Sequence, residues 1–218
     1  MPLSHRFKTI FIHIPKTGGT SIEALLGMHG DRGDIGVVPY PDQVADRRHF
    51  YGRQLQHMTA ARLRAELNDE PVFSSYFKFS VVRNPWDRLV STCAWSGGKW
   101  AMGRMLEREE FDAYVRRTRA AFGAVRDASH PAPLHPHVLP QVSYMFDDAG
   151  RSLVDFIGRT ETIEQDWQVI RARLGINADL PTRMKSVHRP YREYSDAETR
   201  DIVADIYARD IEAFGYRC

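Results

Sequence analysis

Short apolar runs alternate along the chain with longer segments in which apolar residues recur every three or four positions. Thr9 to Ile14 is a short apolar run of the kind that forms a strand, and Ile22 to Leu26 follows at helical spacing before Gly27. A second run, YFKFSVV, leads into a helical segment that opens with Asn84 and a proline. The pattern therefore predicts strand, turn and helix twice.

Five further elements follow from the same criteria. They are a helix over AARLRAEL after the cap Thr59, a charged helix over Met102–Phe122, a short helix over Gln141–Phe146, a strand over Leu153–Ile157 and a helix over Ile163–Leu174 that stops at Gly175. A capping box, Ser195 with Glu198, predicts the start of a last helix that includes Ile206 and Tyr207. Alternating strands and helices predict an α/β fold with a parallel sheet, whose ligands bind beyond the carboxyl ends of the strands.

The chain of 218 residues has the length of one α/β domain, and its composition shows no second one. We therefore predict a single domain over 1–218. Two segments, at about 27–56 and 97–150, are irregular in pattern and rich in glycine, proline and charged residues. We expect these segments to be insertions that select what the domain binds.

Composition narrows the function classes only a little. A formal net charge of +2 is too small to indicate a protein that binds nucleic acid or a membrane surface. Cys93 and Cys218 form no disulfide framework and have no metal-ligand spacing, which favours a reducing compartment. Because we find no leader sequence and no apolar span of membrane length, we expect a soluble, cytoplasmic protein without stable membrane insertion.

The segment PKTGGTS, residues 15–21, has the composition of a phosphate-binding loop. Gly18 and Gly19 allow the backbone to approach an anion closely, and Lys16 adds a full positive charge. Further donors are the backbone N–H groups of Gly19, Thr20 and Ser21 and the hydroxyls of Thr17, Thr20 and Ser21. A terminal phosphate could thus be bound from several directions.

A nucleoside-triphosphatase loop is the obvious alternative for this segment. That loop requires the pattern G-x-x-x-x-G-K-[ST], in which the lysine follows the second glycine. Here Lys16 precedes both glycines, and the first glycine of the pattern is missing. A small-molecule kinase with a variant loop therefore remains an alternative, but not the preferred one.

The turn after the second predicted strand offers a separate anion site. Arg83 leaves the strand, and Ser91 lies seven residues after Asn84, which is close to two helical turns. Arginine makes a planar, charge-assisted pair with phosphate, and serine supplies a neutral donor. Arg83 and Ser91 together would suit a terminal phosphomonoester.

The two stretches PKTGGTS and VVRNPWDRLVS resemble the 5′-phosphosulfate and 3′-phosphate motifs of sulfotransferases that use 3′-phosphoadenosine 5′-phosphosulfate (PAPS). The likeness is closer to the family 2 group, which contains carbohydrate and heparan 2-O sulfotransferases. It extends to HMTAARL, FIGRTETIEQDW and IYARDIEAFGY, and so spans most of the chain. The resemblance implies a P-loop-like three-layer α/β sandwich with a central parallel sheet flanked by helices, in a soluble bacterial relative.

The resemblance also implies how the nucleotide is held. Lys16 and the backbone from Thr17 to Ser21 would bind the 5′-phosphosulfate, and Arg83 and Ser91 would bind the 3′-phosphate. The residues that would complete the cofactor pocket are Arg159, Lys185, Arg189 and Tyr191. No metal would be required, and the product would be 3′-phosphoadenosine 5′-phosphate (PAP). The acceptor would be a hydroxyl on a small molecule or a glycan, and the oligomeric state stays open.

Sulfuryl transfer should follow the logic of in-line phosphoryl transfer, in which positioning and electrostatics supply catalysis. Lys16 would stabilise the charge on the leaving 5′-phosphate. His57 is the preferred general base, because it precedes a helix N-terminus and occupies the place of the base in the related enzymes. His49, or an acidic residue among Glu107, Glu109 and Glu110, is the alternative base. We expect His13 to be a buried, hydrogen-bonded side chain or a brace of the loop, not a catalyst. A PAP-binding module without catalysis is the alternative outside enzymes.

Overall fold

The computed structural model describes residues 3–26, 28, 57–96, 104–126, 134–181 and 188–218. By its contacts the chain divides into two compact units. The first comprises Met1–Val82 and Ser143–Met184, and the second comprises Arg83–Val142 and Lys185–Cys218. The single domain over 1–218 stays a prediction, and much of the two irregular segments lies outside the described residues.

The first unit is built on a sheet of four strands in the order β1-β2-β3-β4. The strands are β1 (Leu3–Ser4), β2 (Thr9–Ile12), β3 (Phe77–Val82) and β4 (Phe156–Arg159). β2, β3 and β4 are parallel, whereas β1 pairs with β2 in the antiparallel sense. The sheet is therefore mixed, and the prediction of a wholly parallel sheet missed β1, because two residues are too few to show a period.

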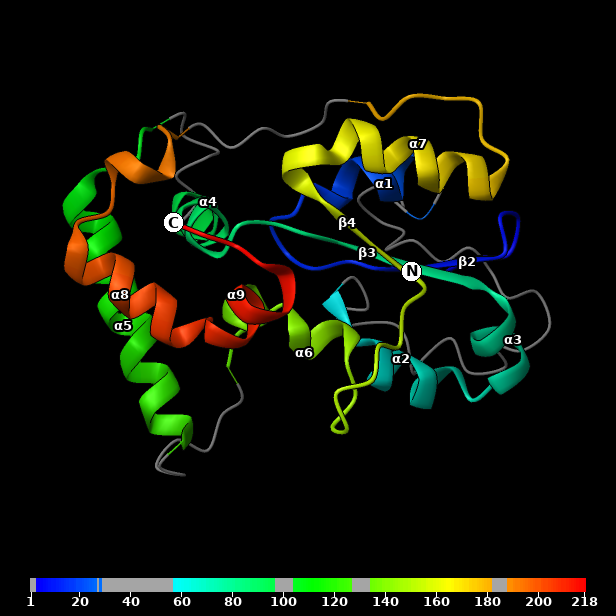
Figure 1. Cartoon of the computed structure of the whole chain (residues 1–218), viewed down its shortest axis with the longest axis horizontal. Helices are drawn as coiled ribbons and strands as arrows, with labels where there is room; N and C mark the ends of the chain where they lie inside the picture. Colours follow the sequence, from blue (N-terminus) through cyan, green and yellow to red (C-terminus); the bar gives the residue numbers. More distant parts are fainter. Residues whose placement is uncertain (1–2, 27, 29–56, 97–103, 127–133, 182–187) are drawn as a thin grey trace. The chain divides into compact units, whose positions relative to one another are not determined.

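Helices cover both faces of this sheet, as Figure 1 shows. On one face lie α1 (Gly19–Leu25) and α7 (Ile163–Leu174), and on the other lie α2 (Ala60–Leu67) and α3 (Glu70–Ser75). Phe11 of β2 and Phe79 of β3 are register partners whose stacked rings are 5.0 Å apart, and they form a buried cluster with Ile22 of α1 and with Trp167 and Ile170 of α7. The three-layer α/β sandwich is confirmed.

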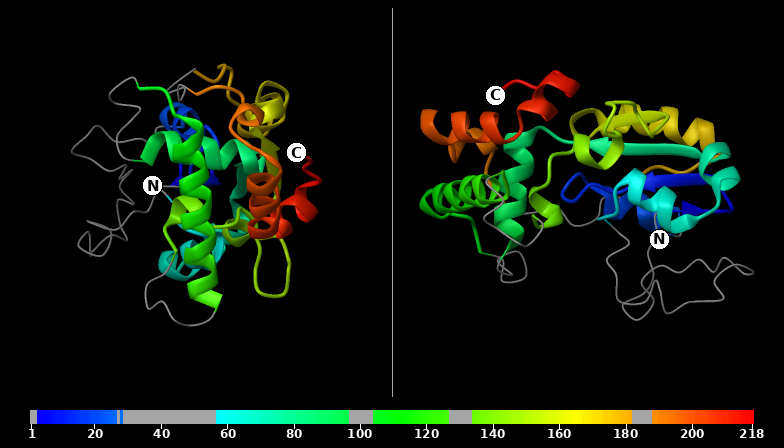
Figure 2. Two further views of the ribbon diagram at one scale, coloured as in Figure 1. Left: turned by 90° about the vertical axis from the view of Figure 1, so that its left-hand side faces the viewer. Right: turned by 90° about the horizontal axis from the view of Figure 1, so that it is seen from below.

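The second unit contains no strand among its described residues. Its elements are α4 (Pro85–Trp95), α5 (Arg108–Arg126), η4 (Pro136–Val138), η6 (Tyr191–Glu193), α8 (Ala197–Ile206) and α9 (Ala208–Phe214), and α6 (Val142–Met145) continues into the first unit. Figure 2 shows α5 and α8 side by side, and Arg116 of α5 donates two hydrogen bonds to Glu198 of α8, at 2.6 and 2.8 Å. In the described parts of the chain, no helix is long and apolar enough to cross a membrane.

The predicted capping box is wrong by one residue. Asp196, not Ser195, caps α8, since its carboxylate accepts the Thr199 N–H at 2.9 Å. Thr199 Oγ1 in turn accepts the Asp196 N–H at 3.0 Å, which completes the box. The helix then ends at Ile206 and α9 starts after Tyr207, so the continuous helix expected through Tyr207 is two helices.

Other boundaries also differ from the predicted ones. The third predicted strand, Leu153–Ile157, is shifted to β4 at 156–159, because the N–H of Leu153 bonds back to the carbonyl of Met145 outside the sheet. The predicted charged helix starts at Arg108, not at Met102. The sequence analysis missed α3, a short helix that begins with a proline in its first turn and is capped by Asp69.

Candidate functional site

The loop between β2 and α1 has an unusual backbone. Lys16 and Gly18 both adopt positive φ angles, 69° and 80°, and only glycine does so without strain. Thr17 Oγ1 donates to the carbonyl of Ile14 at 2.9 Å, and the N–H of Ser21 donates to the carbonyl of Gly18 at 3.2 Å. The Thr17 hydroxyl and the Ser21 N–H therefore hold the loop in shape, whereas the sequence analysis assigned both to the ligand.

Two other donors of the loop remain available to a ligand. The N–H groups of Gly19 and Thr20 begin α1, so they have no acceptor inside the helix, and they donate no hydrogen bond to the rest of the described chain. Open space lies beside Gly18, where a Cβ would meet no atom within 4 Å. Because backbone donors and open space coincide next to Lys16, the loop fits a phosphate or phosphosulfate group.

A glycine is required at the next position, for a different reason. A Cβ on Gly19 would lie 2.8 Å from Cγ of His13, and closer still to Cδ2 and Nε2. The imidazole of His13 is 3% exposed, stacks on Phe11 at 5.4 Å, and has its Nδ1 2.8 Å from Oε1 of the buried Glu23. The two atoms are close, but the contact does not have the geometry of a hydrogen bond. The prediction that His13 is buried is confirmed.

His57 lies directly against His13. Its ring contacts the His13 ring edge-on at 4.8 Å, and its Nδ1 is 3.1 Å from the main-chain carbonyl oxygen of His13. A carbonyl oxygen only accepts hydrogen bonds, so Nδ1 of His57 must carry the hydrogen. In the neutral imidazole the lone pair then lies on Nε2. His57 is therefore held against His13 through Nδ1, and Nε2 is the nitrogen that would carry the lone pair.

Thr160 ties the loop to the sheet. Its hydroxyl lies 3.1 Å from the carbonyl oxygen of Val82, at the end of β3, and 3.2 Å from that of Thr17. Arg159 precedes it at the end of β4, where its N–H donates to Asp166 at 2.8 Å. No local signal in the sequence could link Thr160 to Thr17, because 143 positions separate them.

In the second unit, the backbone of Arg83 is held on both sides by one glutamine. Gln141 Oε1 accepts the N–H of Arg83 at 2.9 Å, and Gln141 Nε2 donates to the carbonyl of Arg83 at 2.8 Å. The guanidinium Nε donates to Asp87 at 2.8 Å, and Asn84 caps α4 by accepting the N–H of Trp86. These contacts fix the start of the second motif, and the pattern around Gln141 gave no sign of its role.

A buried carboxylate supports this glutamine. Asp210 is fully buried and accepts the N–H groups of Gln141 and Val142 at 2.8 and 2.9 Å. Burial raises the pKa of Asp210, although both N–H donors and the nearby Arg88 act to lower that pKa. Arg88 is itself buried and donates to the carbonyl oxygens of Leu139 and His137. The support of Arg83 therefore reaches through the interior of the unit.

The remaining predicted site residues are scattered. Ser91 is buried on α4, and η6 packs against α4, so Tyr191 lies near Asn84 and burial raises the pKa of its hydroxyl. Arg189 is exposed, and its N–H donates to the hydroxyl of Tyr194. Lys185 and the alternative base His49 lie outside the described residues.

The acidic alternative bases lie at the start of α5. Glu110 accepts from Arg104 at 2.8 Å and also accepts the N–H of Glu107, so it acts as a surface cap of that helix. Among the described residues, no group of three or more His, Cys, Asp or Glu side chains is arranged to hold a metal ion.

Within the first unit the structure thus brings the loop, His57 and Arg159 to the same end of the sheet, and within the second it brings Arg83, Ser91 and Tyr191 to α4.

Of three comparisons with known proteins, only the comparison with family models gives a match. A search of curated proteins and a search of solved structures found no significant match. The model of the sulfotransferase family, in contrast, matches residues 3–217, which is nearly the whole chain and includes both the loop after β2 and the segment that starts at Arg83. A match of this extent shows that the chain belongs to the sulfotransferase family.

Proposed function

We propose that this protein transfers a sulfuryl group from PAPS to a hydroxyl of a carbohydrate or another small molecule. Membership of the family supports sulfuryl transfer to a hydroxyl in general. The observation that carries the choice of donor is the loop after β2, where the N–H groups of Gly19 and Thr20 and the open space at Gly18 adjoin Lys16. Such a loop suits the phosphosulfate end of a nucleotide.

The donor would be held at both phosphates. Lys16 and the loop backbone would bind the 5′-phosphosulfate, and Arg83 with Ser91 would bind the 3′-phosphate. The chain supports this pairing, because β2 and β3 are parallel neighbours, so the loop and Arg83 both follow the carboxyl end of a strand. Arg159, Lys185, Arg189 and Tyr191 would complete the nucleotide pocket.

The transfer itself would be an in-line displacement. The acceptor oxygen forms a bond to sulfur while the bond from sulfur to the 5′-phosphate oxygen breaks, and PAP leaves. Nε2 of His57 takes the proton of the acceptor hydroxyl, since Nδ1 is committed to the carbonyl of His13. Lys16 stabilises the negative charge that develops on the leaving phosphate.

Thermal unfolding with added ligand tests the choice of donor. A ligand at about 100 times its dissociation constant stabilises a protein by about 2.7 kcal/mol. We expect PAP without Mg²⁺ to raise the unfolding temperature and Mg-ATP to leave it unchanged. The reverse result would support the variant-loop kinase and refute the proposal.

Two substitutions at one position test the base. His57→Ala should keep PAP binding and lose about 10² to 10⁴ in the rate of transfer from PAPS. His57→Asn is the matched control, because its amide can still donate to the carbonyl of His13 but offers no basic nitrogen at Nε2. Equal losses of transfer rate in both variants would support His57 as the base. Full activity of His57→Asn would show that only the hydrogen bond to His13 matters.

Transfer from labelled PAPS to a panel of sugars, phenols, lipids and tyrosine peptides would identify the acceptor. Transfer to any of them excludes a PAP-binding module without catalysis. The two irregular segments at about 27–56 and 97–150 would lie on the acceptor side of the site, and their residues 27, 29–56, 97–103 and 127–133 lie outside the described part of the chain. A cytoplasmic location is part of the proposal.

A further inference from the structure

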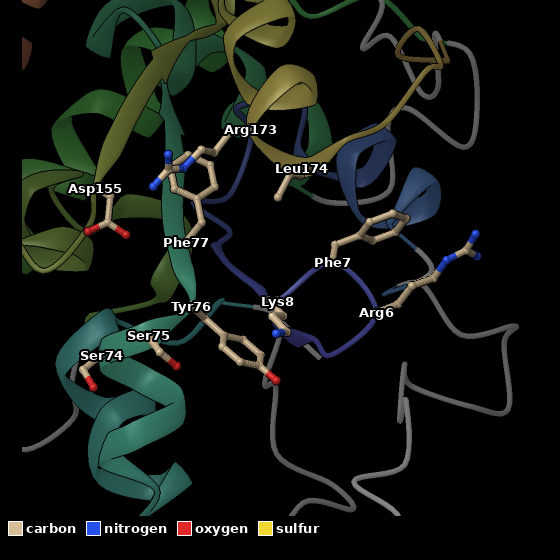
Figure 3. Close-up of a pocket in the computed structure, with 10 residues that line it drawn as sticks. All are labelled: Arg6, Phe7, Lys8, Ser74, Ser75, Tyr76, Phe77, Asp155, Arg173 and Leu174. Atoms are coloured by element: carbon tan, nitrogen blue, oxygen red, sulfur yellow. The ribbon is translucent and has the colours of Figure 1, made fainter.

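A cavity lies in the first unit at the amino ends of the parallel strands, which is the opposite end of the sheet from the loop. It has a volume of about 480 Å³, within the usual range for sites that bind small molecules. Figure 3 shows that its walls come from the turn before β2, the end of α3, the start of β3 and the end of α7. The lining residues are Arg6, Phe7, Lys8, Ser74, Ser75, Tyr76, Phe77, Asp155, Arg173 and Leu174.

The basic side chains of this cavity have no acidic partner among the described residues. Arg173 lies over the ring of Phe77 at 5.8 Å, and Arg6, which extends outward at the rim in Figure 3, lies over Phe7 at 5.1 Å. Lys8 contributes only its main chain to the described hydrogen bonds, with a carbonyl that accepts the N–H of Phe77. Three positive charges therefore border one cavity.

The one carboxylate of the wall is already neutralised. Asp155 accepts the main-chain N–H of Lys78 at 2.7 Å and lies 3.1 Å from its ammonium group. The hydroxyl of Tyr76 is engaged with Nδ1 of His5 at 2.6 Å. Other arginines of the unit are paired, for example Arg171 with Asp179 at 2.9 Å. The positive charge of the cavity therefore has no counterpart in its own wall.

Helix dipoles do not cancel this charge. The C-terminal ends of α3 and α7 reach the cavity at Ser75 and Leu174, and each helix end carries at most about half a negative charge. Together they offset about one of the three positive charges. A net positive field is left, in a space too large for a single oxyanion alone.

We propose that this cavity binds a small molecule that carries a sulfate or phosphate ester. Guanidinium and ammonium groups bind such tetrahedral oxyanions through charge-assisted hydrogen bonds. The faces of Phe7 and Phe77 offer an apolar wall for the rest of the ligand. The cavity and the loop at 15–21 lie at opposite ends of β2, whose four residues span about 13 Å. The cavity is therefore a separate site. The proposal does not depend on the reaction proposed for that loop.

The test adds glucose 6-sulfate, glucose 6-phosphate or neutral glucose to the full chain, once without PAP and once with PAP in excess. Amide NMR shifts locate binding, and titration calorimetry measures affinity. We expect one or both anionic sugars to shift the amides of Lys8, Phe77 and Leu174, and we expect glucose to shift none of them. The two anionic probes also show whether sulfate or phosphate is preferred.

The variant Lys8→Asn with Arg173→Gln should weaken the anionic sugars by about tenfold or more. Asparagine is chosen at position 8 because it tolerates the positive φ angle of 46° there. Arg171→Gln is the matched control, because it removes a positive charge from the same helix at a position that does not line the cavity. The affinity of this variant for the anionic sugars should equal that of the wild type. The proposal is overturned if neither anionic sugar binds, if glucose binds equally well, or if the double variant behaves as the control does.

Discussion

Gly19→Ala tests the packing beneath the loop. An alanine Cβ would lie 2.8 Å from Cγ of His13 and closer to two other ring atoms, whereas ordinary contacts start near 3.4 Å. The ring would have to move by more than about half an ångström, but it is stacked on Phe11 and held against Glu23. Inserting a methyl group into such packing typically costs about 1–3 kcal/mol.

Urea unfolding, followed by circular dichroism, measures this cost as a fall in the free energy of unfolding. Gly123→Ala on α5 is the matched control, since a Cβ there meets no atom within 4 Å. Alanine is the better helix former, so the control should gain up to about 1 kcal/mol. A gain at Gly123 and a loss at Gly19 would separate steric overlap from helix propensity.

Gly19→Ala should also be measured in a chain that carries His13→Ala. His13→Ala removes the ring that the new methyl group would meet, and it keeps the main-chain carbonyl that binds His57. In that background Gly19→Ala should cost almost nothing, which gives a coupling energy of about 1–3 kcal/mol. An equal cost in both backgrounds would show that the overlap with His13 is not the cause.

Three further predictions concern polar contacts that stabilise the fold. Thr160→Val removes the hydroxyl that lies within hydrogen-bond distance of two carbonyl oxygens and should cost about 1–2 kcal/mol in urea unfolding; no loss would refute its role as a tie. Asp210→Ala leaves the buried N–H groups of Gln141 and Val142 without an acceptor and should cost about 2–6 kcal/mol, whereas Asp210→Asn keeps an acceptor and should cost clearly less. Hydrogen bonds at the start of α8 lower the pKa of Asp196 to about 2. The folded pKa lies below the unfolded pKa of about 4, so the stabilisation by ionised Asp196 is complete above pH 4 and is lost as the pH falls through 2. The difference in unfolding free energy between wild type and Asp196→Asn should therefore shrink over that range. A constant difference would contradict this role of Asp196.

Motifs and elements with a strong local pattern could be predicted from the sequence. The loop after β2, the cap at Asn84 and the amphipathic helix α7 each follow from residues within a few positions of one another. The strand β1 could not be predicted, because two residues are too few to show a period. The cap of α8 was misplaced by one residue, because Ser195 and Asp196 are neighbours and both residue types can cap a helix.

The roles of side chains inside the site divide in the same way. The sequence alone marked Lys16, the two glycines and His57 as candidates for an anion-binding loop and a base, since these predictions need only residue type and order. Only the tertiary structure decided which loop groups are engaged inside the protein and which nitrogen of His57 holds the hydrogen. The Thr17 hydroxyl, the Ser21 N–H and Nδ1 of His57 bond to the carbonyl oxygens of Ile14, Gly18 and His13. Hydrogen-bond partners such as Thr160 for Thr17, or Gln141 for Arg83, lie far apart along the chain, and folding alone brings them within reach.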